Sequence, residues 1–247
     1  MKYCKTYENP KIHEVTGETI RPGGFALTKR AIEYCGFGKG ARLLDVGCGL
    51  GATVEYLVDQ HDFDVMGIDA SFMLLKKKKT LRPDLLLIEA KAESLPLESG
   101  SMDGVICECS FSLLEDQKQA LSEFYRVLKD KGRLIITDMY VRNPSSLNSL
   151  RYLDIRSCIT GAKSRLEYWK MLADSGFDLI LWEDHTKYLA ELTAKLILSG
   201  LSIEEFFSYV LSNPKCSCVK ADIKAAKLGY FMLVAKKNDR GADYGHG

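Results

Sequence analysis

A glycine-rich turn after an apolar run is the most informative stretch of this chain. Residues 43–51 read LLDVGCGLG, and an amphipathic helix is expected over 52–57. Glycines let the backbone turn sharply and approach a ligand closely, and the free N–H groups at the start of a helix face such a ligand. The pattern predicts a nucleotide-binding turn whose contact residues are Gly47, Cys48, Gly49 and Gly51.

A carboxylate follows where a ribose would need one. The next expected strand, Asp64 to Ile68, ends at Asp69, about 20 residues beyond the glycines. In nucleotide-binding folds an acid at this distance accepts hydrogen bonds from ribose hydroxyls. We therefore expect Asp69 to bind a ribose, with Ala70 and Met73 beside the same ligand.

Asp45 bears on which nucleotide is bound. The glycines alone also fit the dinucleotide pattern G-x-G-x-x-G/A. A carboxylate two residues before the first glycine would repel a pyrophosphate at short range, whereas it suits an ammonium group. S-adenosylmethionine carries an ammonium, a ribose diol and no phosphate. A nicotinamide oxidoreductase is the alternative, but the sequence offers it no recognisable hydride-transfer site.

Further stretches resemble, in order, the motifs of class I S-adenosylmethionine-dependent methyltransferases. LLDVGCGLG resembles their first motif and VMGIDAS their second strand, AKAESLPL their adenine segment, SMDGVIC their fourth strand, and FYRVLKDKGRL the approach to strand five. The resemblance spans roughly residues 40–140. It implies a small-molecule methyltransferase that binds its cofactor partly through Ala92, Glu93 and Cys109. Lys91 stands where the family has an acid, so adenine would be held by the Ala92 backbone N–H, by Glu93 or by apolar packing alone.

The alternation of apolar runs and amphipathic stretches predicts an α/β, Rossmann-like, doubly wound fold. We expect a seven-stranded, mainly parallel sheet whose last strand is antiparallel, as the resemblance implies. One methyltransferase domain would cover 1–237, with its core at 40–140, 163–183 and 229–236, followed by a disordered tail at 238–247. The expected strands are 42–46, 64–68, 85–89, 103–108, 132–138, 177–182 and 230–236.

Two stretches outside this core are expected to form a helical lid near the C-terminus. They are residues 140–163 and 184–228, and helical apolar spacing is seen at 188–198 and 203–211. Insertions at the carboxyl edge of such a sheet commonly cover the active site. The alternative is that they only add packing.

No catalytic residue can be assigned from the sequence. Methyl transfer is an in-line displacement that relies on alignment, and a base is needed only when the acceptor is protonated. His13 and His185 are candidate bases, although a structural role is as compatible with each. Arg21 is a candidate clamp for the cofactor carboxylate or an anionic acceptor; the alternative is a solvated arginine.

Cysteines in the lid suggest a different acceptor. Thiolates of Cys158, Cys216 and Cys218 would suit a metalloid such as arsenic, in a loose resemblance to arsenic methyltransferases. No standard metal-ligand spacing is present, so no resident metal is expected. A non-catalytic S-adenosylmethionine-binding module is the third hypothesis.

Composition limits the partners. The 247 residues carry a net charge of +1, which gives no reason to expect nucleic acid. The Lys76–Lys79 run is expected to be a solvated face. No apolar run is long enough to predict a transmembrane helix, and no signal peptide is recognisable. We therefore expect a cytoplasmic protein with a small-molecule acceptor. Oligomeric state stays open.

Overall fold

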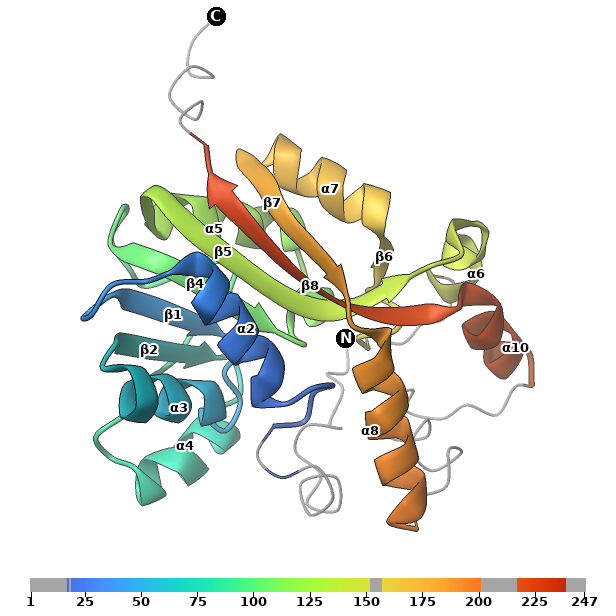
Figure 1. Ribbon diagram of the computed structural model, residues 1–247, viewed down its shortest axis with the longest axis horizontal. Coiled ribbons are helices and arrows are strands. Elements are labelled where there is room, and N and C mark those ends of the chain that lie inside the picture. The colour runs from blue at the N-terminus through green and yellow to red at the C-terminus, as the bar shows by residue number, and fades with distance from the viewer. Residues whose placement is uncertain (1–16, 18, 152–156, 201–216, 239–247) are drawn as a thin grey trace, which may run out of the picture.

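The structure is a computed structural model that describes residues 17, 19–151, 157–200 and 217–238. An eight-stranded sheet runs through this part of the chain, with helices on both faces (Figure 1). Its strands are β1 (Arg42–Val46), β2 (Asp64–Asp69), β3 (Leu86–Glu89), β4 (Met102–Glu108), β5 (Leu128–Val141), β6 (Lys163–Ser164), β7 (Phe177–Asp184) and β8 (Leu228–Lys237).

The strand order is that of a doubly wound fold. The main path reads β3-β2-β1-β4-β5-β8-β7. The first five of these strands run parallel, and β8 is antiparallel to both β5 and β7. The predicted fold class is therefore confirmed, including the antiparallel last strand.

The strand lengths differ from expectation in two places. β5 begins at Leu128 and ends at Val141, so it takes in part of the expected approach turn and two residues assigned to the lid. β6 is a two-residue strand beside Tyr140 and Val141, which adds an eighth strand off the main path. A strand this short leaves no periodic pattern in the sequence.

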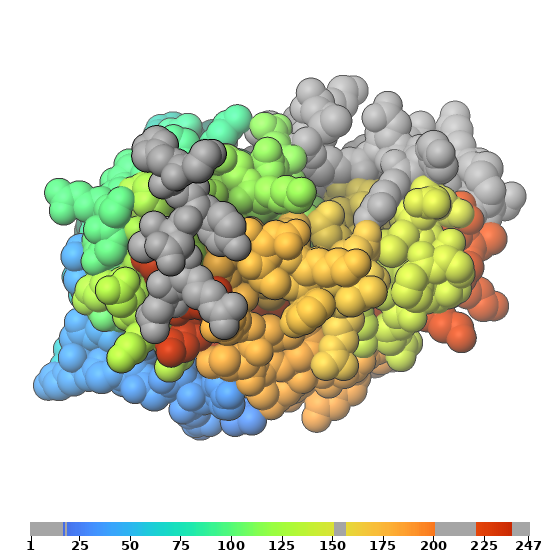
Figure 2. Space-filling view, turned by 90° about the horizontal axis from the view of Figure 1, so that it is seen from above, coloured from blue at the N-terminus to red at the C-terminus, as the bar shows by residue number. Residues whose placement is uncertain are grey.

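Helices cover the two faces of the sheet and bury separate apolar clusters. Leu27, Val54 and Leu75, from three helices, belong to one cluster, whereas Phe124 and Tyr168 belong to the other. Those on the first face are α2 (Phe25–Cys35), α3 (Ala52–His61) and α4 (Phe72–Leu81); those on the second are α5 (Gln117–Val127) and α7 (Arg165–Asp174). Figure 2 shows α7 and β7, in yellow to orange, across the middle of the face seen from above.

The remaining elements lie toward the carboxyl ends of the parallel strands (Figure 1). They are η2 (Phe111–Leu113), η3 (Pro144–Ser146), α6 (Leu147–Arg151), α8 (Thr186–Leu198) and α10 (Ser217–Ala226). The helix expected at 188–198 is thus present, while 203–211 and the tail from 239 lie outside the described residues. No helix in the described ranges is both long and apolar enough to span a membrane.

The lysine run is only partly the expected solvated face. Lys76, Lys77 and Lys79 are exposed, but Lys78 is 3% exposed and its Nζ lies 2.5 Å from Glu55 Oε2. Arg82 pairs with the same carboxylate at 2.6 Å. An ion pair between α4 and α3 therefore recruits one lysine of the run into the fold.

Candidate functional site

The glycine turn joins β1 to α3 at the carboxyl edge of the sheet. The N–H groups of Gly47 and Cys48 donate to the Ile68 carbonyl at 2.8 and 3.0 Å, which ties the turn to β2. Gly47 has φ +74°, and a Cβ there would lie 2.5 Å from the Ser110 Cβ. Gly51, at φ +67°, is the N-cap of α3. Side chains at these glycines would therefore distort the turn.

Asp69 holds this turn against the end of β2. Its Oδ2 accepts a hydrogen bond from the Gly49 N–H and its Oδ1 accepts one from the Ser71 N–H, both at 2.8 Å. A Cβ on Gly49, at φ +54°, would meet no atom within 4 Å. The backbone at Gly49 is thus open on its Cα side, as close approach of a ligand requires.

Three carboxylates come together behind the turn. Asp45 is 3% exposed at the end of β1, and its pKa is raised to about 8. Burial is the main cause, followed by the negative charge of Glu108, while Arg21 opposes the shift and Asp69 adds to it. The same burial, with Asp45 and Asp69 nearby, raises the pKa of the Cys48 thiol.

Glu108, which the sequence reasoning missed, is the centre of a buried polar network. Arg21 Nη2 lies 3.0 Å from Glu108 Oε2, with the two side chains 10% and 2% exposed. Thr28 and Thr53 donate hydroxyl hydrogen bonds to the two carboxylate oxygens at 2.8 and 2.9 Å. A charged residue inside the apolar run of β4 was the available signal, because a buried charge needs partners.

The expected adenine segment follows β3 and is anchored to α5 and to the loop before it. Ala92 is buried, and Glu93 Oε1 accepts from the N–H groups of Glu115 and Asp116 at 2.8 and 3.2 Å. Lys91 forms an exposed ion pair with Glu115 at 3.5 Å. The Glu93 carboxylate thus already serves to hold the loop before α5.

Ala70 and Met73, expected beside the ribose, lie on the surface at the start of α4. Ala70 is exposed, and the Met73 side chain is 67% exposed. Both follow Asp69 along the chain.

Cys109, at the tip of β4, adopts a left-handed backbone. Its φ is +55°, which is uncommon for a residue other than glycine. Its N–H donates to the Thr137 carbonyl at 2.7 Å, and the next residue, Ser110, donates to the Val46 carbonyl at 2.9 Å. These two bonds draw the ends of β1, β4 and β5 together around the predicted site.

The histidines and cysteines outside the glycine turn and the β4 tip were candidates for the acceptor side of the site. His185 precedes α8, and its Nε2 lies 3.0 Å from Glu183 Oε2. Cys158 is half-buried against the first apolar cluster. His13 and Cys216, like the side chain of Cys218, lie outside the described residues. Within the described ranges, no three His, Cys, Asp or Glu side chains are placed to hold a metal ion.

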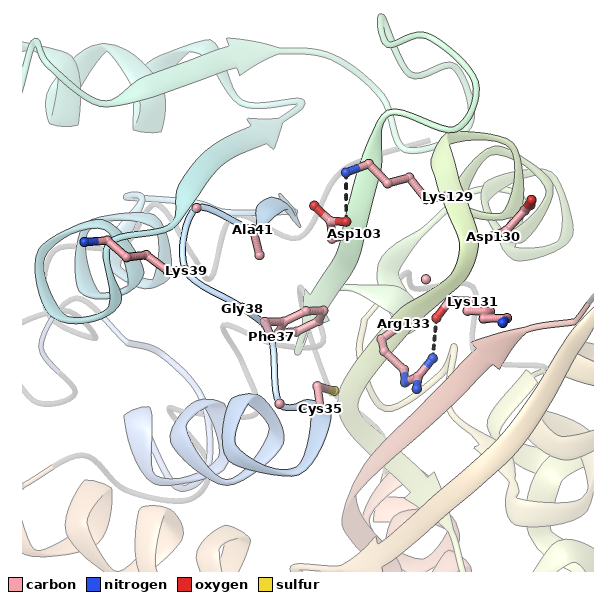
Figure 3. A pocket seen from close by; sticks show the side chains of 13 residues that line it. Cys35, Phe37, Gly38, Lys39, Ala41, Asp103, Lys129, Asp130, Lys131 and Arg133 are labelled. Carbon is pink, nitrogen blue, oxygen red and sulfur yellow. Dashed lines mark hydrogen bonds and ion pairs between the residues drawn. The ribbon is translucent and has the colours of Figure 1, made fainter.

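A cavity of about 410 Å³ lies at the opposite edge of the sheet (Figure 3). It is lined by the loop after α2 and by the starts of β4 and β5. Its Lys129 pairs with Asp103 at 2.8 Å, and Lys39 pairs with Asp62 at 2.9 Å. None of the predicted cofactor-binding residues lines this cavity.

Comparison with known proteins shows which proteins this chain resembles. Residues 44–136 match a family model described as a methyltransferase domain. Phosphoethanolamine N-methyltransferase 3 of Arabidopsis thaliana is 25% identical over 232 residues, which cover 89% of this chain and 47% of that protein. The chain thus spans about half the length of this relative.

Solved structures share the fold at low identity. The [4+2]-cyclase SpnF has a TM-score of 0.71 at 20% identity, covering 95% of this chain and 93% of that one. Phosphoethanolamine N-methyltransferase 2 of Haemonchus contortus, in complex with phosphomonomethylethanolamine and S-adenosylhomocysteine, has a TM-score of 0.72 at 18% identity, covering 96% and 60%. The chain therefore has the Rossmann-like fold of its methyltransferase neighbours and carries a methyltransferase-domain match over residues 44–136.

Proposed function

We propose that this protein binds S-adenosylmethionine at the carboxyl edge of its sheet and transfers the methyl group to a small-molecule acceptor. The observation that carries the proposal is the charge behind the glycine turn. Asp45 and Glu108 are both buried there, and within the described residues Arg21 forms an ion pair with Glu108 and acts on Asp45 only through its charge. A ligand with an ammonium group would offset the remaining negative charge, whereas a pyrophosphate would add to it.

The residues fit such a ligand in defined roles. Asp45 would pair with the ammonium, and Asp69 would exchange its bond to Gly49 N–H for ribose hydroxyls. The open Cα side of Gly49 would admit the nucleoside. Buried Ala92 would pack on the adenine, in keeping with the departure at Lys91.

The bound cofactor would supply a methyl group on a sulfonium. The acceptor's lone pair would form a bond to the methyl carbon as the carbon–sulfur bond breaks, and the electron pair would return to sulfur. The contribution of the chain is to align the two partners and to exclude water. A protonated acceptor would also need to lose a proton to a base or to water.

For the methyl acceptor we propose only its class, a small molecule. A relative is named for phosphoethanolamine, yet a similar fold also carries a cyclase, and fold alone does not assign a substrate. The metalloid hypothesis stays a prediction, because two of its three thiols lie outside the described residues.

Calorimetric titration tests the proposal directly. We expect S-adenosylmethionine and S-adenosylhomocysteine to bind in the micromolar range, NAD not to bind, and Asp69→Ala to weaken binding at least tenfold. Lys118→Ala, at an exposed position on α5, is the matched control and should bind like wild type. Folded protein that binds NAD instead would overturn the proposal. Binding with no turnover across an acceptor screen would favour the non-catalytic module.

A further inference from the structure

A buried ion pair fastens the segment before α2 to the edge where the cofactor would bind. We propose that Arg21 and Glu108 are positioning residues: their ion pair holds residues 21–24 against this edge and sets the charge balance around Asp45. The proposal rests on the proposed cofactor site. It gives a role to Glu108, which the cofactor motifs leave unassigned, and gives Arg21 a role other than the clamp that the sequence suggested.

The Glu108 carboxylate joins three elements. Glu108 is the last residue of β4, and its carboxylate accepts hydrogen bonds from Thr28 of α2 and Thr53 of α3. Arg21 adds the segment before α2, because its Nη2 also donates to Thr28 Oγ1 at 2.9 Å and its Nε donates to the Gly24 carbonyl at 3.2 Å. A carboxylate satisfied on both oxygens and paired with a guanidinium fixes geometry more firmly than one exposed pair does.

The fastened segment also reaches α8. A Cβ on Gly23 would lie 3.1 Å from the ring of Tyr188 and 3.1 Å from Leu27. Residues 21–24 therefore lie between the β4 tip and a helix of the expected lid. Loosening the ion pair should disturb the cofactor edge and this helix contact together.

The electrostatic part of the role concerns Asp45. The charged groups that act on it are Glu108 from β4, Asp69 from β2 and Arg21 from the segment; the Cys48 thiol is the further titratable group on the turn. Glu108 and Arg21 act on Asp45 in opposite senses. Removing one or the other charge should therefore shift the ionisation of Asp45 in opposite directions, although both changes break the same ion pair.

The test is the pH dependence of S-adenosylhomocysteine binding from pH 6 to 9, followed by calorimetry. In wild type, binding should strengthen with rising pH up to about 8, where Asp45 becomes ionised. Glu108→Gln should move this midpoint down by about one pH unit or more, and Arg21→Gln should move it up. Both should weaken the plateau affinity at least tenfold. The ammonium of the ligand titrates identically in every experiment.

Two further variants separate charge and position from general damage. Arg21→Lys keeps the charge and should keep the wild-type midpoint. Arg30→Gln breaks an exposed ion pair, 2.8 Å long, that joins α2 to Glu183. It should leave both the pH midpoint and the affinity for S-adenosylhomocysteine unchanged. Midpoints that do not move, or that move the same way in Glu108→Gln and Arg21→Gln, would overturn the proposal. Failure of wild type to bind S-adenosylhomocysteine would instead overturn the cofactor site itself.

Discussion

Asp45 is the residue at which folding and binding make opposite demands. Its carboxyl is buried beside Glu108, and its pKa is raised to about 8. Burial disfavours the charged form of this carboxyl, so its ionisation destabilises the fold. The same charge is what the proposed ammonium contact needs.

Replacing this residue should therefore stabilise the free protein and remove its function. Because the pKa of Asp45 is higher in the folded protein than in the unfolded chain, the contribution of Asp45 to stability should fall as pH rises from about 4 to about 8 and then level off. Asp45→Asn should lack that decline, so its melting temperature should exceed that of wild type by more at pH 8 than at pH 5. Thermal melts at several pH values measure this. Parallel pH profiles for the two proteins would contradict it.

Two glycines of the turn should differ in their tolerance of a side chain. Gly47→Ala places a Cβ against Ser110 at positive φ and should cost about 3 kcal/mol. Gly49→Ala meets no neighbour, so only the backbone conformation is penalised, by about 1 kcal/mol. Urea denaturation gives both values. Equal costs would mean that Ser110 yields freely.

Among the elements, the N-terminus of α5 contributes no group to the proposed site. Asp116 is its N-cap, and its Oδ1 accepts hydrogen bonds from the N–H groups of Lys118 and Gln119, both at 3.0 Å. The helix then buries Leu121 and Phe124 under the sheet. Its contribution should be to stability alone.

Asp116→Ala should therefore lower the free energy of unfolding by about 1 kcal/mol. Affinity for S-adenosylhomocysteine should stay at the wild-type value. Chemical denaturation and calorimetry on the same preparation provide the two measurements. Lys118→Ala keeps the cap and should change stability by less than about 0.5 kcal/mol. A loss of affinity in Asp116→Ala would mean that the loop held by Glu93 shapes the site.

At the scale of the whole molecule, the site is a meeting point of elements far apart in the chain. The segment before α2, the ends of β1, β2 and β4, and the start of α3 all contribute groups to it. A ligand bound there should stabilise all of them together.

Ligand binding should thus raise the melting temperature of the entire fold. At 100 times its dissociation constant, S-adenosylhomocysteine should add about 2.7 kcal/mol, equivalent to a rise of about 5–10 °C for a chain of this size. Differential scanning fluorimetry measures the shift, with NAD as the control nucleotide. A comparable shift with NAD would argue for a dinucleotide site.

The resemblance to methyltransferases and the fold class could both be predicted from local sequence features, and the family-model match and the strand order bear them out. Gly47 and Gly51, recognised in the sequence as turn glycines, adopt positive φ in the structure. Asp69 ends β2, where an acid that binds ribose was expected. These features are local, because turn chemistry and strand periodicity are encoded within a few neighbouring residues. The cofactor contacts of the individual residues stay predictions, as do the cytoplasmic location and the roles of the lid.

Which distant groups meet depends instead on how the elements pack together. Arg21 and Glu108 form an ion pair although they lie far apart in the chain. The residues next to each of them do not predict this pairing. Lys78 likewise leaves its solvated run because Glu55 lies on the adjacent helix. Pairings of this kind depend on how elements pack, and the energy of a buried charge is set by that packing rather than by its neighbours in the chain.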